Sequence, residues 1–465
     1  MRAHRGVFTL LAVLVTSGGA CGGGRGPSTT ETATAPGLAV RALEPATACT
    51  AAAAAIYRAG PTTAPRGALL ACSDDGTRSI ADLSSRANLL GHVGPALTST
   101  ARVLRVAYRT ERLAGQPGVG TALVYLPGRP RAWPVPAVVV AHGTIGLADV
   151  CAPSRKGGAF VDELALPLVG AGFAVIAPDY AGLGNGRGRT YQGWGIAEDQ
   201  AHSVLDAARA LQHLVAPGAL GRFALVGHSQ GGGAVLAAQA ALASDGADLD
   251  VASVVAFAPG WYDARIFGRI LGHGDAPLRG RFEVLHAFAA MWFFAHSAVY
   301  DGTAAAADAF AAPLRVAVTR AMDQRCILTL GADLARAARS VGELYDPAFV
   351  ASVQACLGPG PCSGPGQRWL ERVIADRPTL SPDGPPVVLI QGLLDGIVTP
   401  SATRCTLDRL QADHVPTHAC TLAGTDHFSV LGRAAPLLAS ILDGNPLTCA
   451  NTLPACAPVD DILSH

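Results

Sequence analysis

The segment Gly227-His-Ser-Gln-Gly231 is the feature that most constrains how this chain can fold. It follows the apolar run 223–226 and precedes the helix-prone stretch 234–240. A strand that reverses sharply into a helix strains its turn residue, and flanking glycines let the chain fold back closely. The pattern therefore predicts that Ser229 projects from the end of a strand, at the positive end of a helix, where it can attack a carbonyl. The alternative is a glycine-rich turn with an incidental serine.

A histidine and an acid with the expected order follow this serine along the chain. Serine is a weak nucleophile unless a histidine takes its proton and an acid orients that histidine. Asp395 comes just after the apolar run 387–391, and His427 comes shortly after the run 418–422. A serine on a strand-to-helix turn is followed in the chain by the acid and then by the histidine. We therefore predict that Ser229, His427 and Asp395 form a catalytic triad.

Two other acidic residues remain alternatives to Asp395. Asp263 lies beyond the predicted strand 252–258 and is a possible substitute. Asp426 adjoins His427, and a direct neighbour reaches the imidazole only at a poor angle. The position of Asp395 at the end of a predicted strand favours it over both.

A second glycine-containing segment predicts donors for a developing oxyanion. The apolar run 137–141 reads as a buried strand that ends in His142-Gly-Thr144. In this type of site one donor is the backbone N–H after the nucleophile, here Gln230, and the other comes from the loop after an earlier strand. Thr144 is the candidate for that second donor. The alternative is that the glycine at position 143 merely serves the turn.

Four segments together resemble a known family. They are Ala141-His-Gly-Thr-Ile-Gly-Leu-Ala-Asp149, Cys151-Ala-Pro-Ser154, Ala177-Pro-Asp-Tyr-Ala-Gly-Leu-Gly184 and Gly227-His-Ser-Gln-Gly-Gly232. From about position 103 to 442 the chain resembles the secretory lipase family, the fungal lipase-A-like branch of the α/β-hydrolase superfamily. The resemblance implies hydrolysis of carboxylic esters and acylglycerols by a Ser-Asp-His triad, with a helical cap and without a metal or an organic cofactor.

The pattern of apolar runs predicts an α/β-hydrolase fold, a mostly parallel sheet with helices on both faces. Strands are expected at 102–108, 121–126 and 173–177 besides those above, with helices at 161–170 and 197–215. The alternation stops between Pro259 and Pro386, so we expect a helical cap inserted between strands 6 and 7. The expected organisation is a signal peptide at 1–20, a flexible tether at 21–45, a catalytic domain at 46–260 and 386–465, and a cap at 261–385.

Four residues are candidates for substrate contacts. Tyr180 and His228 belong to the segments that carry the resemblance, and Trp292 and Phe293 lie in an aromatic stretch of the expected cap. For the two cap residues the alternative is that they form the core of the cap, as aromatic clusters at helical spacing usually do.

The N-terminus predicts export. Residues 1–5 carry positive charge, and the apolar stretch 7–15 is too short to span a bilayer as a helix. Small residues before Cys21 suggest that this cysteine is lipidated, which would hold the enzyme at a membrane surface; ordinary cleavage with secretion is the alternative.

Ten further cysteines form an even set, as disulfides in an exported chain require. The expected pairs are 49/72, 356/362, 405/420, 449/456 and 151/326. Buried free cysteines are the alternative.

Composition restricts the classes of function. Of 465 residues, 50% are hydrophobic and 15% charged, which predicts a large globular core. The formal net charge is zero and no basic run stands out, so we expect no nucleic acid partner. No H-E-x-x-H or paired C-x-x-C occurs, so no metal site is expected. A serine peptidase and a non-catalytic surface binding protein remain alternatives to an ester hydrolase, and the sequence assigns no oligomeric state.

Overall fold

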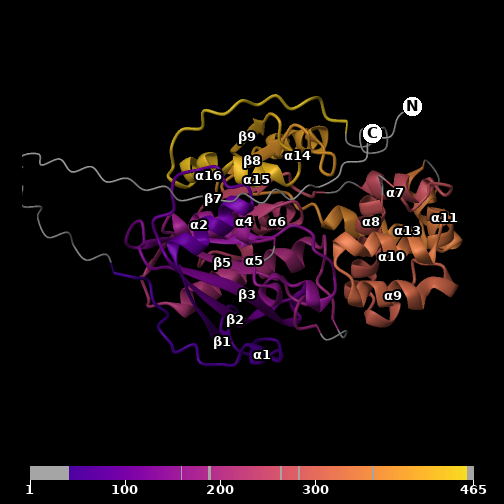
Figure 1. Ribbon diagram of the computed structural model, residues 1–465. Coiled ribbons are helices and arrows are strands. Elements are labelled where there is room, and N and C mark those ends of the chain that lie inside the picture. The colour runs from indigo at the N-terminus through magenta and orange to yellow at the C-terminus, as the bar shows by residue number, and fades with distance from the viewer. Residues whose placement is uncertain are drawn as a thin grey trace, which may run out of the picture. The chain divides into compact units, whose positions relative to one another are not determined.

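The fold of the described residues is built on one central sheet. The computed structural model describes residues 41–158, 160–186, 190–261, 264–280, 283–358 and 361–457, so residues 1–40, with Cys21 and the expected signal peptide, lie outside it. The described residues form a nine-stranded sheet in the order β1-β2-β3-β5-β4-β6-β7-β8-β9 (Figure 1). The strands are β1 Leu69–Arg78, β2 Ala101–Glu111, β3 Pro117–Pro127, β4 Val135–Ala141, β5 Ala174–Pro178, β6 Leu220–His228, β7 Val251–Phe257, β8 Val387–Gly392 and β9 Thr417–Leu422.

Six neighbouring strands run parallel, in the order β5, β4, β6, β7, β8 and β9. The pairs β1–β2, β2–β3 and β3–β5 are antiparallel. At the centre, Val139 of β4 lies opposite Ile176 on one side and Leu225 on the other. The expectation of a mostly parallel sheet is confirmed. Since parallel strands end at one edge, the loops after β4, β6, β8 and β9 meet there.

Strand β1 was not predicted, so the strands counted as 6 and 7 from the sequence are β7 and β8, and the insertion lies between them as expected. The middle of this strand reads Ser73-Asp-Asp-Gly76, residue types that are depleted in strands. Within the described residues it forms the edge of the sheet, where it pairs with β2 and makes one isolated bridge, from Ser73 to Thr50. An exposed edge tolerates such polar residues, which hides the strand from a search for apolar runs.

Helices cover both faces of the sheet. Alternate residues of β4 point to opposite faces: Val139 belongs to a core shared with α5, α6 and α14, while Val138 and Val140 belong to a core shared with α2, α4, α15 and α16. The helices outside the segment between β7 and β8 are α1 Ala53–Ile56, α2 Ile80–Leu89, α3 Pro153–Lys156, α4 Asp162–Gly170, α5 Ala197–Leu214, α6 Gln230–Asp245, α14 Pro400–Ala412, α15 Ser429–Arg433 and α16 Ala435–Leu442, with the 3₁₀ turns η1 Leu113–Gly115 and η2 Asp149–Cys151.

The chain between β7 and β8 is helical and is called the cap below (residues 264–375), drawn in orange in Figure 1. It has its own hydrophobic core, around Trp292, Phe293 and Trp369. Its elements are α7 Ala264–Gly272, α8 Glu283–Tyr300, η3 Thr303–Ala305, η4 Ala312–Leu314, α9 Arg315–Gln324, α10 Ile327–Ala337, α11 Val341–Leu344, α12 Pro347–Leu357 and α13 Gly364–Ala375. Within the described residues, no helix has the length and apolarity needed to cross a membrane.

Ten cysteines of the described residues form five disulfides. The expected pairs Cys49–Cys72, Cys151–Cys326 and Cys356–Cys362 are present. The expected pairs 405/420 and 449/456 are wrong, because Cys405 bonds Cys456 and Cys420 bonds Cys449. The segment after α16 runs back along β9, where the Thr421 N–H donates to the Ala450 carbonyl oxygen at 2.8 Å. This return brings Cys449 to Cys420 and Cys456 to Cys405, so the pairs closest in sequence do not form.

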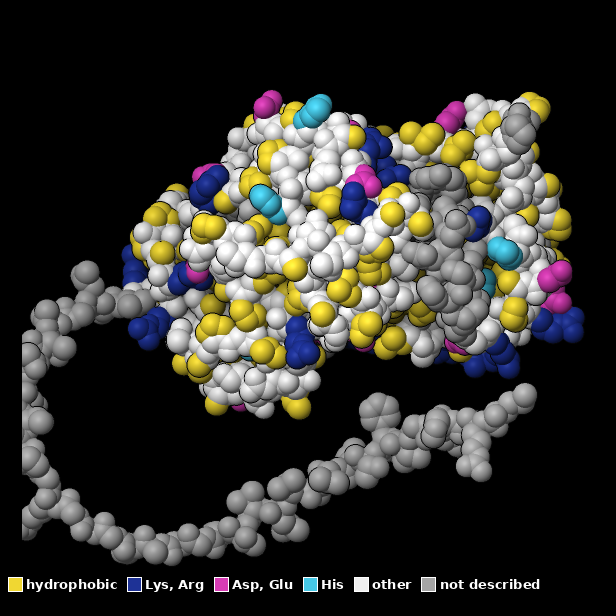
Figure 2. All heavy atoms as spheres, turned by 90° about the horizontal axis from the view of Figure 1, so that it is seen from above, with side chains coloured by type: hydrophobic (Ala, Val, Ile, Leu, Met, Phe, Trp, Pro, Cys, Tyr) yellow, Lys and Arg dark blue, Asp and Glu magenta, His cyan; other side chains and the backbone are white. Residues whose placement is uncertain are grey.

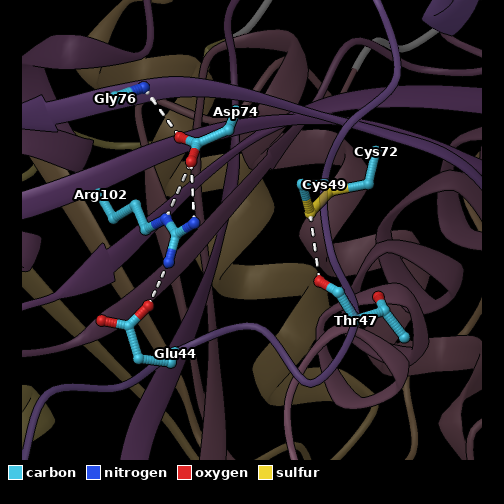
Figure 3. The surroundings of a disulfide bond; sticks show 7 residues. All are labelled: Glu44, Thr47, Cys49, Cys72, Asp74, Gly76 and Arg102. Carbon is cyan, nitrogen blue, oxygen red and sulfur yellow. Dashed lines mark hydrogen bonds and ion pairs between the residues drawn. A yellow bond between two sulfur atoms is a disulfide. The ribbon is translucent and has the colours of Figure 1, made fainter.

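The first disulfide holds the N-terminal segment against the edge of the sheet (Figure 3). Beside it, Arg102 of β2 forms ion pairs with Asp74 of β1, at 2.8 Å, and with Glu44. A covalent link and an ionic link therefore act on the same short stretch of chain. On the face that Figure 2 presents, Lys and Arg side chains are scattered, several with Asp or Glu beside them.

Candidate active site

Ser229 occupies a strained turn between β6 and α6. Its φ of 55° and ψ of −114° lie where a side chain is unfavourable, so the surroundings must hold it there. Its N–H donates to the Phe257 carbonyl oxygen at 2.9 Å, and its own carbonyl accepts from the N–H groups of Gly233 at 3.2 Å and Gly260 at 2.7 Å. The serine side chain is 3% exposed. This is the strained strand-to-helix turn that the sequence pattern predicts.

The glycines on either side of Ser229 are required by close backbone contacts. A Cβ atom on Gly227 would lie 2.0 Å from the Gly231 carbonyl oxygen, and one on Gly231 would lie 1.9 Å from that of Ala141. Real Cβ atoms do not approach backbone oxygens so closely. The turn can therefore form only with glycine at both positions.

Asp395 and His427 are hydrogen-bonded to each other at the same edge of the sheet. Asp395 follows β8 and His427 follows β9, and His427 Nδ1 lies 2.7 Å from Asp395 Oδ2. The other carboxylate oxygen accepts from the N–H groups of Ile397 at 2.8 Å and Val398 at 3.0 Å. Both triad candidates are buried. The carboxylate is thus fixed by backbone donors, and it fixes which imidazole nitrogen carries a proton.

His228 connects the serine turn to the histidine loop. Its Nε2 lies 2.8 Å from the His427 carbonyl oxygen, and the two rings are 4.5 Å apart. Burial, reinforced by His427, lowers the pKa of His228 well below its usual value. The residue before Ser229 is thereby attached to the residue proposed as its base.

The structure places one of the two alternative acids, Asp426, and does not describe the other, Asp263. Asp426 accepts hydrogen bonds from the N–H groups of Phe428 and Ser429 and from the Ser429 hydroxyl, at 2.7 to 3.1 Å. Its carboxylate is therefore engaged by the first residues at the start of α15. Asp263 lies outside the described residues.

The loop after β4 approaches Ser229 with its carbonyl groups engaged elsewhere. A Cβ atom on Gly143 would lie 3.5 Å from Ser229 Cβ. The Gly143 carbonyl oxygen lies 2.6 Å from His142 Nδ1, and in a trans peptide the next N–H, that of Thr144, points the opposite way. Gln230 is the first residue of α6, where helical N–H groups have no intrahelical acceptor. Both N–H groups therefore remain candidates for binding an anion.

Comparisons with known proteins agree with this fold. A family model described as the alpha/beta hydrolase fold matches residues 136–271. The chain has the α/β-hydrolase fold. No curated protein sequence matches it. Among solved structures, the rice cell wall degrading esterase LipA from Xanthomonas oryzae is similar, with 18% identity, a TM-score of 0.63, and 82% of this chain and 97% of that one covered. Candida antarctica lipase A is also similar, with 16% identity, a TM-score of 0.62, and 86% and 89% covered.

Tyr180 supports the loop after β4. Its hydroxyl donates to the His142 carbonyl oxygen at 2.8 Å, and its φ of 68° is unusual for a bulky residue. The preceding Asp179 is buried and accepts from Thr121 Oγ1 at 2.6 Å and from the Ser154 N–H at 2.9 Å. Burial raises the pKa of Asp179 to about 6, against the opposing effect of these bonds. Two of the segments behind the resemblance, C-A-P-S and P-D-Y, therefore meet in one buried network.

Trp292 and Phe293, expected as substrate contacts, lie in the core of the cap. The Trp292 ring is 3.4 Å from that of Phe267 and 4.3 Å from that of Trp369, and the Phe293 ring is 4.6 Å from Trp369. Both side chains are buried. Their surroundings are those of the alternative reading, in which the aromatic stretch is structural.

Two residues that the sequence did not single out contact the oxyanion candidates. Gln192 hydrogen-bonds the Gln230 side chain, and Trp194 hydrogen-bonds the Thr144 hydroxyl. Both lie in the segment Tyr-Gln-Gly-Trp-Gly between β5 and α5. Large residues beside glycines in this loop were the sequence feature that could have drawn attention to them, but the residues that they contact are visible only in the fold.

Proposed function

We propose that the protein is an exported carboxylic ester hydrolase, lipase-like, that cleaves esters or acylglycerols through a covalent acyl-enzyme. The observation that carries the proposal is the 2.7 Å bond between His427 Nδ1 and Asp395 Oδ2, together with a serine in a strained turn that His228 joins to the His427 loop. A histidine fixed in this way presents its other nitrogen as a base. The names of the similar structures, an esterase and a lipase, support an ester substrate.

The proposed reaction has two halves. Ser229 Oγ attacks the ester carbonyl carbon while His427 takes the hydroxyl proton, and the tetrahedral oxyanion accepts hydrogen bonds from the N–H groups of Gln230 and Thr144. His427 then gives its proton to the departing alcohol, which leaves an acyl group on Ser229. Water, deprotonated by His427, attacks this acyl group, and His427 returns the proton to Ser229 Oγ as the acid is released. Asp395 orients the imidazole and stabilises its protonated form throughout.

Substrate specificity and catalytic competence are tested with one panel. Wild-type protein and Ser229→Ala are assayed on p-nitrophenyl esters from acetate to palmitate and on peptide substrates. We expect ester hydrolysis by the wild type, with a loss of roughly 10⁶ in kcat in the variant. Cleavage of peptides in preference to esters would replace the proposal by a serine peptidase. No turnover of any substrate would replace it by a binding protein on the same scaffold.

Export is supported by the five disulfides, which form and persist in oxidising compartments. Lipidation of Cys21 is part of the proposal. Mass spectrometry of the mature N-terminus tests it, with a lipid-modified Cys21 as the expected result. An unmodified chain that begins elsewhere would leave secretion without an anchor.

A further inference from the structure

One buried glutamine joins the two loops that carry the proposed oxyanion donors. Gln192 is 0% exposed. Its Oε1 accepts from Gln230 Nε2 at 2.9 Å, at the start of α6. Its Nε2 donates to the Gly146 carbonyl oxygen at 2.7 Å, two residues after Thr144. The side chain therefore fixes the separation between the serine turn and the loop after β4.

A tryptophan two residues later contacts the second donor residue directly. Trp194 Nε1 donates to Thr144 Oγ1 at 3.1 Å. The indole is buried and lies parallel to the ring of Phe288 in α8, with centroids 6.2 Å apart and planes at 19°. The Thr144 side chain is thus held by a residue that is itself packed beneath the cap.

The loop that carries Gln192 and Trp194 is fixed in turn. Between them, the Gly193 N–H donates to Asp199 Oδ2 at 3.0 Å. Arg112 donates to the Tyr191 carbonyl oxygen at 2.7 Å and forms an ion pair with Asp199 at 2.5 Å. The two side chains therefore extend from a support with several independent anchors.

We propose that Gln192 and Trp194 are positioning residues of the oxyanion site. This inference rests on the proposed function. Backbone donors stabilise a tetrahedral oxyanion only when they already stand where the charge develops, so their value depends on the loops that carry them. Neither side chain is assigned contact with the substrate. Their contribution is made through Gln230 and Thr144, and it is larger for the transition state than for the ground state.

The test uses two variants, each with a control of the same kind. Gln192→Leu removes both hydrogen bonds of the Gln192 side chain with little change in its volume, and Trp194→Phe removes the indole N–H. Gln239→Leu is the control for the first variant. Gln239 is a buried glutamine like Gln192, but it lies in α6 more than two turns from Gln230 and hydrogen-bonds Ser381. Trp369→Phe is the control for the second, because its indole nitrogen has no hydrogen-bond partner among the described residues.

The readouts separate positioning from general stability. We expect Gln192→Leu and Trp194→Phe to lower kcat on a p-nitrophenyl ester by about tenfold to a hundredfold, with KM within about twofold. The inhibition constant of an alkyl boronic acid, whose serine adduct is tetrahedral and anionic, should rise in proportion. That of the matching primary alcohol should not change. The control variants should lower the melting temperature and leave kcat unchanged.

If the wild type hydrolyses esters and both variants keep its kcat and its boronic acid affinity, the inference is overturned while the proposed function stands. Loss of activity in the controls to the same extent would also overturn it. If the wild type has no esterase activity, the proposed function fails first. Should Gln192→Leu not fold, Gln192→Glu carries the test, since it keeps the acceptor for Gln230 and loses the donor to Gly146.

Discussion

His228 donates a hydrogen bond from Nε2 to the backbone carbonyl oxygen of His427, at 2.8 Å. A carbonyl oxygen only accepts, so the proton is on Nε2 of His228. The lowered pKa keeps this imidazole neutral. The bond spans 199 positions of sequence and joins the serine turn to the loop of the proposed base. The relative position of the proposed nucleophile and base thus depends on a residue that has no part in the proposed proton transfer.

We therefore predict that His228→Phe lowers kcat on esters by at least about tenfold, because the loop of His427 loses its attachment. His228→Gln, whose side-chain amide can donate to the same carbonyl, should restore much of the activity. The measurement is kcat and KM at pH 8 together with the melting temperature. Full activity in His228→Phe would show that the bond does not position the base.

The raised pKa of Asp179 predicts how the free energy of unfolding depends on pH. Its folded pKa of about 6 lies above its unfolded value of about 3.9, whereas burial lowers the pKa of His142 to about 4, below an unfolded value of about 6.5. As pH falls from about 6 to 4, the folded state gains a proton at Asp179 and the unfolded state gains one at His142. The first effect stabilises the fold and the second destabilises it, each by about 1.4 kcal/mol per pH unit.

Asp179→Asn removes the stabilising half of this pair. Below pH 6 its free energy of unfolding should therefore fall more steeply than that of the wild type, by about 1.4 kcal/mol per pH unit. Denaturant unfolding at pH 7, 6, 5 and 4 measures the two slopes. Parallel profiles for the two proteins would contradict the raised pKa of Asp179.

The aromatic residues of the cap are predicted to act on stability. Trp292→Ala and Phe293→Ala should each cost about 3 to 5 kcal/mol, since both remove large buried side chains. The ratio of kcat/KM between short and long esters should stay the same. A change of that ratio worth about 1 to 3 kcal/mol, with an unchanged melting temperature, would instead identify an acyl-binding wall.

Much of the fold was predictable because buried parallel strands are continuous apolar runs. The runs before Gly143, Ser229 and Asp395 became β4, β6 and β8 with boundaries shifted by a few residues. Strand β1 was missed because an edge strand needs no such run. The two C-terminal disulfides were paired wrongly because the return of the chain along β9 is a tertiary feature with no local signal.

The candidate site divides in the same way. The positions of Ser229, Asp395 and His427 follow from a motif and from strand ends, both of which are local. The contacts of Gln192 and Trp194 join segments 38 and 50 positions apart. They depend on the order of strands in the sheet, which places the loops after β4, β5 and β6 together. No spacing of residues in the sequence predicts that these loops come into contact.

The central claim is that Ser229 forms a covalent intermediate with the help of His427. Labelling with a fluorophosphonate, followed by intact mass measurement and peptide mapping, tests it most directly. The account predicts one adduct per chain, on Ser229, with loss of ester hydrolysis in proportion to labelling, and at least a hundredfold slower labelling in His427→Ala. Ester hydrolysis that survives complete labelling of Ser229, or an adduct on another residue, would contradict it.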